Sequence, residues 1–362
     1  MSDNRRVYRG IKQGLLQLYP KQLTGNQARH LNTLTGMMTG IIQSKRCQLE
    51  AMASKVPDPS QVNSRVKRFS RYTQNEQIEQ ATYFVPFIEL LLAGLASQGT
   101  IVVVMDGSEV GRNCLALVVS VIYKGRALPL AWVVVQGKKG HFPETAHLEL
   151  LAQVKALIPA QTDVIFLGDG EFDGVALQAE ITVAGWHYVC RTAKNRWVGE
   201  QEDWFQLQDL GLCPGRYVCL HDLTFTQQAY GPVLVIAWWH PDYQEPLYLV
   251  SNFELGREAI YWYGKRFKIE TFFSDQKSRG FQLDKSHLSD PDRLARLMIA
   301  ACLAYIWIIY LGVVAQRDGW LARLHRTDRC DLSLFQLGLR LLDLLLNDDR
   351  PIPFSLVMPS SA

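Results

Sequence analysis

Apolar side chains follow two different periods along this chain of 362 residues, and the change falls near residue 99. Up to residue 98 they recur at helical intervals between polar breaks, and little of the pattern is typical of a strand. The segment Pro57-Asp58-Pro59-Ser60 predicts a turn between helices. The predicted helical stretches are Gly10–Leu18, Gln27–Ala53 and Gln77–Leu95. Residues 1–98 are therefore predicted to form an all-helical unit.

From Gly99 onward, short β-branched runs alternate with helical stretches. Three runs separated by tight turns predict three consecutive strands, and a helix, a strand, a second helix and a fifth strand follow. In chain order these elements are Thr100–Met105, Asn113–Tyr123, Ala127–Gln136, Thr145–Leu157, Val164–Leu167, Phe172–Ala184 and His187–Arg191. This order is typical of a ribonuclease-H-like α/β core, in which a hairpin-built meander is extended by parallel strands through helical crossovers.

The rest of the chain predicts a β-rich insertion followed by helices. Residues 194–248 are rich in aromatic side chains and hold no sustained helical period. Helices are predicted from Arg257 past Lys277, over Ile299–Val314, and over Leu332–Leu346. We expect a helical unit at 1–98, a core in two parts at 99–193 and 249–318, the insertion at 194–248, and a helical tail at 319–362.

Composition is that of an ordinary globular protein, with 48% hydrophobic and 20% charged residues, and disorder is not expected. The apolar runs are interrupted or shorter than the roughly 20 residues that a membrane-spanning helix needs. The first six residues lack the apolar stretch of a secretory signal. Seven scattered cysteines form no disulfide framework. We expect a cytoplasmic protein with reduced cysteines and no membrane contact.

Charge is divided unevenly along the chain. Residues 1–98 hold thirteen Lys or Arg and six Asp or Glu, a net charge of +7, so residues 99–362 carry −4 of the overall +3. This asymmetry favours a polyanion-binding helical arm, although a solvated helical surface would show a similar excess. Four cations cluster on one short predicted helix and suit phosphate contact, namely Arg65, Lys67, Arg68 and Arg71.

Two acids follow predicted buried strands. Asp106 comes after Ile101-Val102-Val103-Val104-Met105, and Asp169 comes after Val164-Ile165-Phe166-Leu167-Gly168. Each Asp-Gly pair taken alone is more typical of a turn than of a ligand. Two carboxylates at neighbouring strand ends, however, repel each other unless a cation lies between them. Together they predict a divalent metal site, and oxygen ligands favour magnesium or manganese.

A third acid lies in a charged stretch that is predicted to be helical. At about 100° per residue, Arg266, Glu270 and Lys277 fall within one narrow stripe that also contains Tyr263. A carboxylate flanked by two cations and a phenol can bind a metal ion and grip phosphate oxygens. Taken alone, the same stripe is also typical of an exposed helix face with spaced ion pairs.

The spacing Tyr, two residues, Arg, three residues, Glu, six residues, Lys resembles the YREK signature of insertion-sequence-4 family transposases. The resemblance implies a ribonuclease-H-like fold in which Asp106, Asp169 and Glu270 bind two Mg²⁺ or Mn²⁺ ions. It also implies DNA nicking, a hairpin at the element end and strand transfer into a target. In this family Tyr263, Arg266 and Lys277 would hold phosphates near the scissile bond.

The same resemblance gives the expected partners. These are double-stranded DNA, as terminal inverted repeats of an element and as target, and a second copy of the chain in the synaptic complex. Bound to DNA, the protein would associate with the bacterial nucleoid. Related members hold a flipped base on an aromatic side chain of the insertion. Trp238 and Trp239 are the candidates, and either could instead pack the core of the insertion.

Other constellations carry less weight. His141, Glu144 and His147 have a spacing that zinc ligands could share, but Pro143 lies among them and no further ligand with zinc spacing follows. Asp163 precedes its strand and Asp173 fits an early helical turn, so neither these nor Glu171 replaces Asp169 as the expected ligand. Two further cations could extend a DNA surface or be solvated, namely Arg279 and Lys285.

Three other functions remain open at this point. A structure-specific nuclease or junction resolvase of the same fold would cut DNA without joining it. A domesticated element would bind DNA without cutting it, although the three acids are intact. An RNA-directed hydrolase would need a single-strand module, and no aromatic-rich one is evident outside the insertion.

Overall fold

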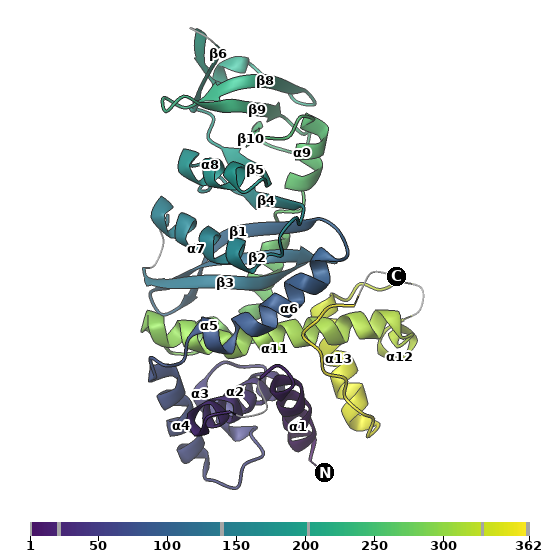
Figure 1. The fold of residues 1–362 in the computed structure, drawn as a ribbon. Helices are drawn as coiled ribbons and strands as arrows, with labels where there is room; N and C mark the ends of the chain where they lie inside the picture. Colours follow the sequence, from purple (N-terminus) through teal and green to yellow (C-terminus); the bar gives the residue numbers. More distant parts are fainter. Residues whose placement is uncertain (1, 20–22, 138–140, 201–202, 327–328, 360–362) are drawn as a thin grey trace.

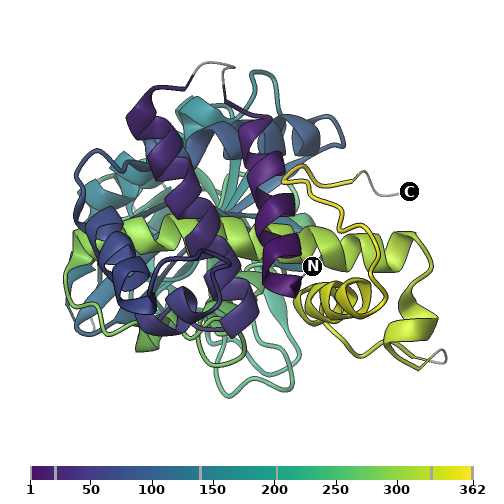
Figure 2. The same ribbon diagram turned by 90° about the horizontal axis from the view of Figure 1, so that it is seen from below.

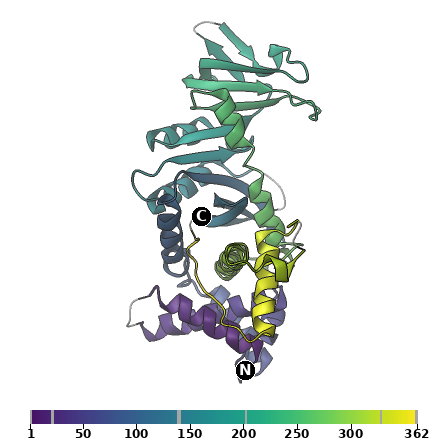
Figure 3. The same ribbon diagram turned by 90° about the vertical axis from the view of Figure 1, so that its right-hand side faces the viewer.

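The computed structural model describes residues 2–19, 23–137, 141–200, 203–326 and 329–359. Helices and one large mixed sheet make up these residues, and the predicted α/β fold is confirmed. Figure 1 shows the strands stacked through the upper part of the molecule and the N-terminal helices gathered at the lower end. Figure 3 shows the same division from the side, with the long helix α11 seen nearly end-on between the two parts.

The N-terminal residues are helical as predicted, but two of the predicted helices are broken. They form α1 (Asp3–Leu16), α2 (Gly25–Ser44), α3 (Leu49–Ser54), α4 (Val62–Gln74), α5 (Gln80–Tyr83) and α6 (Val85–Ala96). The predicted helix Gln27–Ala53 ends at Lys45, which adopts a left-handed conformation with φ of 55°. The predicted helix Gln77–Leu95 is split at Phe84, directly before Val85-Pro86 begins the next helix. Proline fits the first turn of a helix and disfavours its interior.

The sheet contains the predicted core order. In the described residues its ten strands follow the order β3-β2-β1-β4-β5-β10-β9-β8-β6-β7. Strands β1 (Ile101–Gly111), β2 (Cys114–Tyr123) and β3 (Arg126–Gln136) form an antiparallel meander. Strand β4 (Val164–Gly168) pairs parallel with β1, and β5 (His187–Thr192) pairs parallel with β4. The crossover helices are α7 (Glu144–Leu157) and α8 (Val175–Val183).

The strands of the predicted insertion extend this sheet. They are β6 (Trp197–Glu200), β7 (Asp203–Gln206), β8 (Tyr217–Phe225) and β9 (Tyr230–Trp238), with a short 3₁₀ turn at Leu207–Leu210. Strand β10 (Leu247–Ser251) lies between β5 and β9, antiparallel to both. The β-rich character of this segment agrees with its sequence pattern. The division of the chain into five units stays a prediction, because the strands on both sides of these boundaries belong to one sheet.

One long apolar helix joins the two parts of the molecule. Helix α11 (Pro291–Arg317) begins at Asp290, whose side chain accepts a hydrogen bond from the Arg293 backbone N–H. Within the described part of the chain it is the one helix long and apolar enough to cross a membrane, and 94% of that apolar window is buried inside the protein. It packs against β3, α2, α4 and α13 (Leu334–Asn347). Figure 2 shows α1 and α2 crossing over it from below.

Four shorter elements complete the described part of the chain after the sheet. Helices α9 (Gly256–Tyr263) and α10 (Lys268–Gln276) follow β10, and the 3₁₀ turn η2 (Leu283–Lys285) precedes α11. A single turn, α12 (Leu321–Leu324), lies between α11 and α13. The predicted buried helix over Ile299–Val314 is confirmed and is longer at both ends. The predicted helix over Leu332–Leu346 corresponds to α13.

Candidate active site

Asp106 lies inside strand β1 and not directly after it, which corrects the predicted strand end. The parallel pairing of β1 with β4 stops at Val104, while β1 continues to Gly111 because it pairs with β2. Asp106 is opposite Val118 in that antiparallel pairing, and its Oδ1 accepts a hydrogen bond from the Gly107 backbone N–H. The carboxylate therefore lies at the point where the parallel part of the sheet ends, as a strand-end ligand would.

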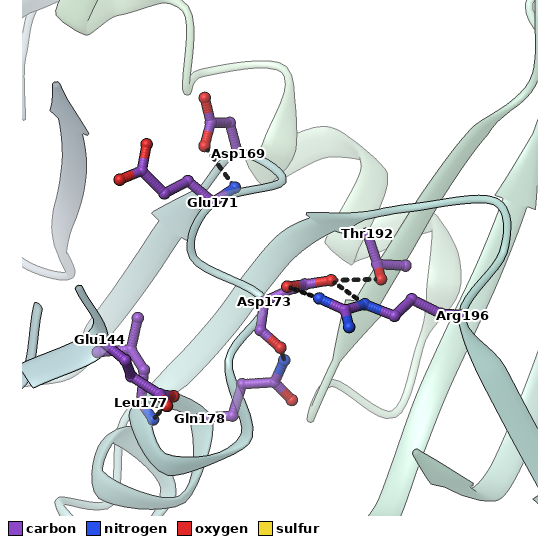
Figure 4. A network of polar contacts seen from close by, with 8 residues as sticks. All are labelled: Glu144, Asp169, Glu171, Asp173, Leu177, Gln178, Thr192 and Arg196. Atoms are coloured by element: carbon purple, nitrogen blue, oxygen red, sulfur yellow. Dashed lines mark hydrogen bonds and ion pairs between the residues drawn. The ribbon is translucent and has the colours of Figure 1, made fainter. Parts of the chain in front are cut away.

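Asp169 follows β4 directly, at the start of the loop that leads to α8. Its Oδ1 accepts a hydrogen bond of 2.9 Å from the Glu171 backbone N–H, which fixes the side chain against its own loop (Figure 4). Gly168 makes this turn possible, since a Cβ there would lie 2.6 Å from Phe172 Cβ and 3.1 Å from Cys190 Sγ. Both acids are thus placed at the same edge of the parallel strands.

The charged stretch from Tyr263 to Lys277 does not form one helix, and the predicted single stripe is wrong. Helix α9 ends at Tyr263, a turn follows, and α10 begins at Lys268. Within the turn the Arg266 backbone N–H donates to the Tyr263 carbonyl, so Arg266 stays close to Tyr263 despite the break. Lys277 is the residue that ends α10. A rotation of 100° per residue therefore does not relate these side chains to one another.

Arg266 nevertheless joins two of the acids. Its Nη1 lies 3.7 Å from Asp106 Oδ2, and its Nη2 lies 3.6 Å from Glu270 Oε1. The guanidinium side chain is 9% exposed, whereas that of Glu270 is 61% exposed. Asp169 and Arg266 line one pocket. Two acids from separated segments, Asp106 and Glu270, therefore contact one buried cation, and Asp169 lines the same pocket as that cation.

The electrostatics of this site are those of crowded acids. Burial and the nearby charge of Asp169 raise the pKa of Asp106 to about 6, against the lowering by Arg266 and the Gly107 N–H. Within the described ranges no three His, Cys, Asp or Glu side chains lie close enough to hold a metal ion together. The oxygen atoms of these acids still fit a hard divalent cation, because such an ion would neutralise the repulsion between the carboxylates.

Lys277 and Tyr263 complete the surroundings of the acids. Lys277 Nζ donates a 2.5 Å hydrogen bond to Ser108 Oγ on β1, two residues beyond Asp106. Burial lowers the pKa of Lys277, while the charges of Asp284, Glu109 and Asp106 raise it. Burial raises the pKa of Tyr263 to about 12, so its phenol is a neutral hydrogen-bond donor at neutral pH. Sequence reasoning missed Ser108, because Ser and Lys are 169 residues apart.

The comparison with protein families decides the class of this site. A family model described as a transposase DDE domain matches residues 100–307, which include Asp106, Asp169 and Glu270. The chain belongs to this family of transposases. The protein is therefore a DNA transposase, a metal-dependent enzyme that cleaves DNA.

Two other comparisons complete the picture. No curated protein matches this transposase. Its chain is similar to a cryo-EM structure of the piggyBac transposase synaptic complex with hairpin DNA, at a TM-score of 0.48 and 12% sequence identity. That similarity covers 96% of this chain and 78% of the other.

A polar network supports the loop that carries Asp169 in the transposase (Figure 4). The buried carboxylate of Asp173 accepts hydrogen bonds from Arg196 Nε at 3.0 Å, Arg196 Nη2 at 2.8 Å and Thr192 Oγ1 at 2.7 Å. Gln178 Nε2 donates to the Asp173 carbonyl. The prediction that Asp173 lies in an early helical turn is wrong, because α8 begins at Val175 and Asp173 precedes it. Its carboxylate is instead held by Thr192 of β5 and by Arg196 of the loop after β5. The network therefore ties the loop after β4 to the neighbouring strand.

The zinc-like spacing of His141, Glu144 and His147 is not a zinc site. His141 Nδ1 lies 3.2 Å and His147 Nε2 lies 3.4 Å from the oxygens of Glu171, so both histidines pair with one acid. Glu144 Oε1 instead accepts from the Leu177 backbone N–H at the start of α8. These contacts are structural supports of the loop after β4.

The two candidate tryptophans differ in their surroundings. Trp238 lines a pocket together with Tyr263, Arg266 and Phe267. Trp239 instead donates from Nε1 to the Tyr243 carbonyl at 3.0 Å. Sequence spacing could not separate them, because the two residues are adjacent and the sequence does not show that β9 ends between them, at Trp238.

The predicted basic residues of α4 divide into two groups. Arg65 Nη1 donates to the Val56 carbonyl, and Arg68 Nη2 lies 2.8 Å from Asp58 Oδ2. Lys67 and Arg71 are exposed. Beyond the acids, Arg279 and Lys285 are also exposed, and Arg279 lines a pocket with Arg126 and Lys124. The DNA contacts of all these residues stay predictions.

Proposed function

We propose that this protein is an insertion-sequence-4 type transposase that moves an element by a cut-and-paste reaction. Asp106, Asp169 and Glu270 would hold two Mg²⁺ or Mn²⁺ ions. The observation that carries the proposal is the convergence of Asp106 and Glu270 on Arg266, in a site where burial and the charge of Asp169 raise the pKa of Asp106. The spacing Tyr263, Arg266, Glu270 and Lys277 supports the same family.

The bound metal ions would activate the attacking oxygen and stabilise the leaving oxygen. The side chains around them have separate tasks. Arg266 would compete with metal for Asp106 and Glu270, and its guanidinium would then turn to a phosphate, for which it has the same bidentate geometry. Lys277 would hold a phosphate from the β1 side, where Ser108 fixes its ammonium group. Tyr263 would donate a hydrogen bond as a neutral phenol.

The DNA substrate would be the terminal inverted repeats of the element and then a target duplex, bound by two copies of the chain. We propose that water nicks the first strand and that the freed 3′-hydroxyl attacks the opposite strand, which forms a hairpin and releases the flanking DNA. Water would then reopen the hairpin and return the 3′-hydroxyl that is joined to the target. Of the two tryptophans, Trp238 is the better candidate to stack on a flipped base, since it lines the pocket beside Tyr263 and Arg266. The basic N-terminal arm would hold the duplex.

The test uses a labelled duplex that carries an inverted repeat flanking the gene, with magnesium and full-length protein. Nicked, hairpin and joined products are resolved on a denaturing gel. Wild-type protein is expected to yield all three, and Glu270→Gln none. Glu258→Gln is the matched control, because Glu258 is an exposed acid on α9 outside the site and should react as wild type.

Each outcome has one meaning. Equal cleavage by wild type and Glu270→Gln removes Glu270 from the site. Cleavage without joined products favours a nuclease of the same fold. Binding without any cleavage, with fresh metal present, favours a domesticated DNA-binding protein.

A further inference from the structure

Helix α4 is fastened to the core of the protein by one face. Phe69, Tyr72 and Thr73 are buried on this face. From α11, Arg293 Nη2 donates to Ser70 Oγ at 3.3 Å, and Arg296 Nη1 donates to the Thr73 carbonyl at 3.2 Å. Because these contacts come from the helix that packs on the catalytic sheet, α4 has a fixed orientation relative to that sheet.

The opposite face of α4 is polar, exposed and without partners. At 100° per residue its side chains fall within an arc of about 100° around the helix axis. In the part of the chain that the structure describes, none of them makes a hydrogen bond or an ion pair. This outward face consists of Asn63, Ser64, Lys67, Arg71 and Gln74.

The chemistry of the outward face matches base edges in DNA. Arg and Lys donate to guanine O6 and N7, Asn and Gln pair with adenine N6 and N7, and Ser suits either. The 13 residues of α4 include no acid, whereas a face kept only for solubility usually mixes both signs. Arg65 and Arg68 do not share this role, because Arg65 holds the Val56 carbonyl and Arg68 pairs with Asp58.

The length and place of α4 also suit a groove. Thirteen residues span about 20 Å, and the major groove, roughly 12 Å wide, admits one helix. In Figure 1 the helix lies at the outer edge of the N-terminal helices. A helix held from behind by two arginines can present its outer face to a duplex without moving.

We propose that α4 is the element that reads the sequence of the DNA end, with its outward face in the major groove. Lys67 and Arg71 would read guanines and Asn63 and Gln74 adenines, while Arg65 and Arg68 hold the helix in place. The inference rests on the proposed function, since it names how the transposase recognises its own element.

The test selects binding sites from a pool of duplexes with a randomised centre, using full-length protein and no divalent metal, so that binding is separated from cleavage. Wild type is expected to enrich one sequence. Lys67→Ala, Arg71→Ala and Gln74→Ala should each relax the preference at one or two positions, with about 5- to 150-fold less discrimination against the wrong base. Arg71→Lys keeps the charge and should lose discrimination while the salt dependence of binding is retained.

Arg46→Ala is the matched control. Arg46 is an exposed cation in the turn between α2 and α3, outside the outward face of α4, so its loss should leave the enriched sequence unchanged. An enriched sequence that is identical in wild type and in the α4 variants overturns the proposal. The proposal also fails if the α4 variants bind every sequence more weakly but keep the same sequence preference, which would make α4 a phosphate-binding helix. It fails as well if the wild-type protein enriches no sequence. None of these outcomes bears on the proposed cleavage, which the Glu270→Gln experiment tests separately.

Discussion

The buried ion pair between β3 and α10 gives the most quantitative prediction for this transposase. Arg126 Nη1 lies 3.1 Å from Asp275 Oδ2, with side-chain exposures of 10% and 6%. Burial raises the pKa of Asp275 to about 6, and Arg126 and Arg279 oppose that rise. Because α10 also carries Glu270, this pair fixes the catalytic helix against the sheet. We therefore consider the variant Arg126→Met, which leaves the carboxyl buried without its cation.

The magnitude follows from the distance and the pKa. At an effective dielectric constant near 20, two charges 3.1 Å apart attract by about 5 kcal/mol. Removing one partner of a buried pair usually costs about 3–5 kcal/mol. The carboxyl can escape part of this cost by taking up a proton, since its pKa is already near 6 in the presence of Arg126. At neutral pH we expect Arg126→Met to lower the free energy of unfolding by about 3 kcal/mol.

The pH dependence has a definite sign. In wild type the folded pKa of Asp275 lies above the unfolded value near 3.9, so its contribution to stability falls as pH rises from about 4 to 6. In Arg126→Met the folded pKa is higher still. Above pH 6 the variant therefore holds one more proton than wild type, and the advantage of wild type grows by about 1.4 kcal/mol per pH unit. Well below pH 6 Asp275 is protonated in both folded proteins, so the advantage of wild type stays at its smallest value and no longer depends on pH.

The assay is urea unfolding of wild type, Arg126→Met, Asp275→Asn and the double variant at pH 5.5 and pH 7.5. The double variant should be more stable than Arg126→Met at pH 7.5, because no carboxyl remains to be neutralised. Arg323→Met is the control, since Arg323 pairs with Asp348 at 2.7 Å on the surface and should cost at most about 1 kcal/mol. An Arg126→Met penalty that is equal at both pH values, or unchanged in the double variant, would refute this reasoning.

Three further predictions concern the active site. Ligand carboxylates must lose their proton to bind metal, and the pKa of Asp106 is about 6. At limiting magnesium the rate of cleavage should therefore fall about tenfold per pH unit below pH 6. A rate that is flat between pH 5 and 8 contradicts this prediction. Trp238→Ala should slow hairpin formation about 5- to 150-fold by loss of base stacking, whereas Trp239→Ala should leave it near wild type, as single-turnover gels would measure. Ser108→Ala removes the hydrogen bond to Lys277 and should reduce the rate of cleavage about tenfold, and Ser108→Thr should restore it. A wild-type rate for Ser108→Ala would exclude this positioning role of Ser108.

Local pattern in the sequence predicts most strands and helices of the core, and it places two of the proposed acids relative to their strands. The spacing of apolar residues indicates which face of a helix or strand is buried, and this spacing involves only residues that are close to one another in the chain. The order of strands and helices in the core followed from it, as did the position of Asp169 after β4. The pattern also places Asp106 just beyond the part of β1 that pairs with β4, although pairing with β2 carries its strand five residues further. The most specific part of the family resemblance is the spacing of Tyr263, Arg266, Glu270 and Lys277, and this spacing is the same whether or not the backbone between these residues is helical.

Tertiary contacts decided what the side chains meet. The break between α9 and α10 removes the single stripe that helical geometry predicted, yet Arg266 still contacts Asp106, 160 residues away in the chain. The support of Asp169 by Asp173 and Arg196, and the anchoring of Lys277 on Ser108, likewise pair residues with no local relation. Such contacts form only when the packed sheet and helices bring distant segments together. Local residue preferences carry no information about them, because each partner is satisfied equally well by water until the chain folds.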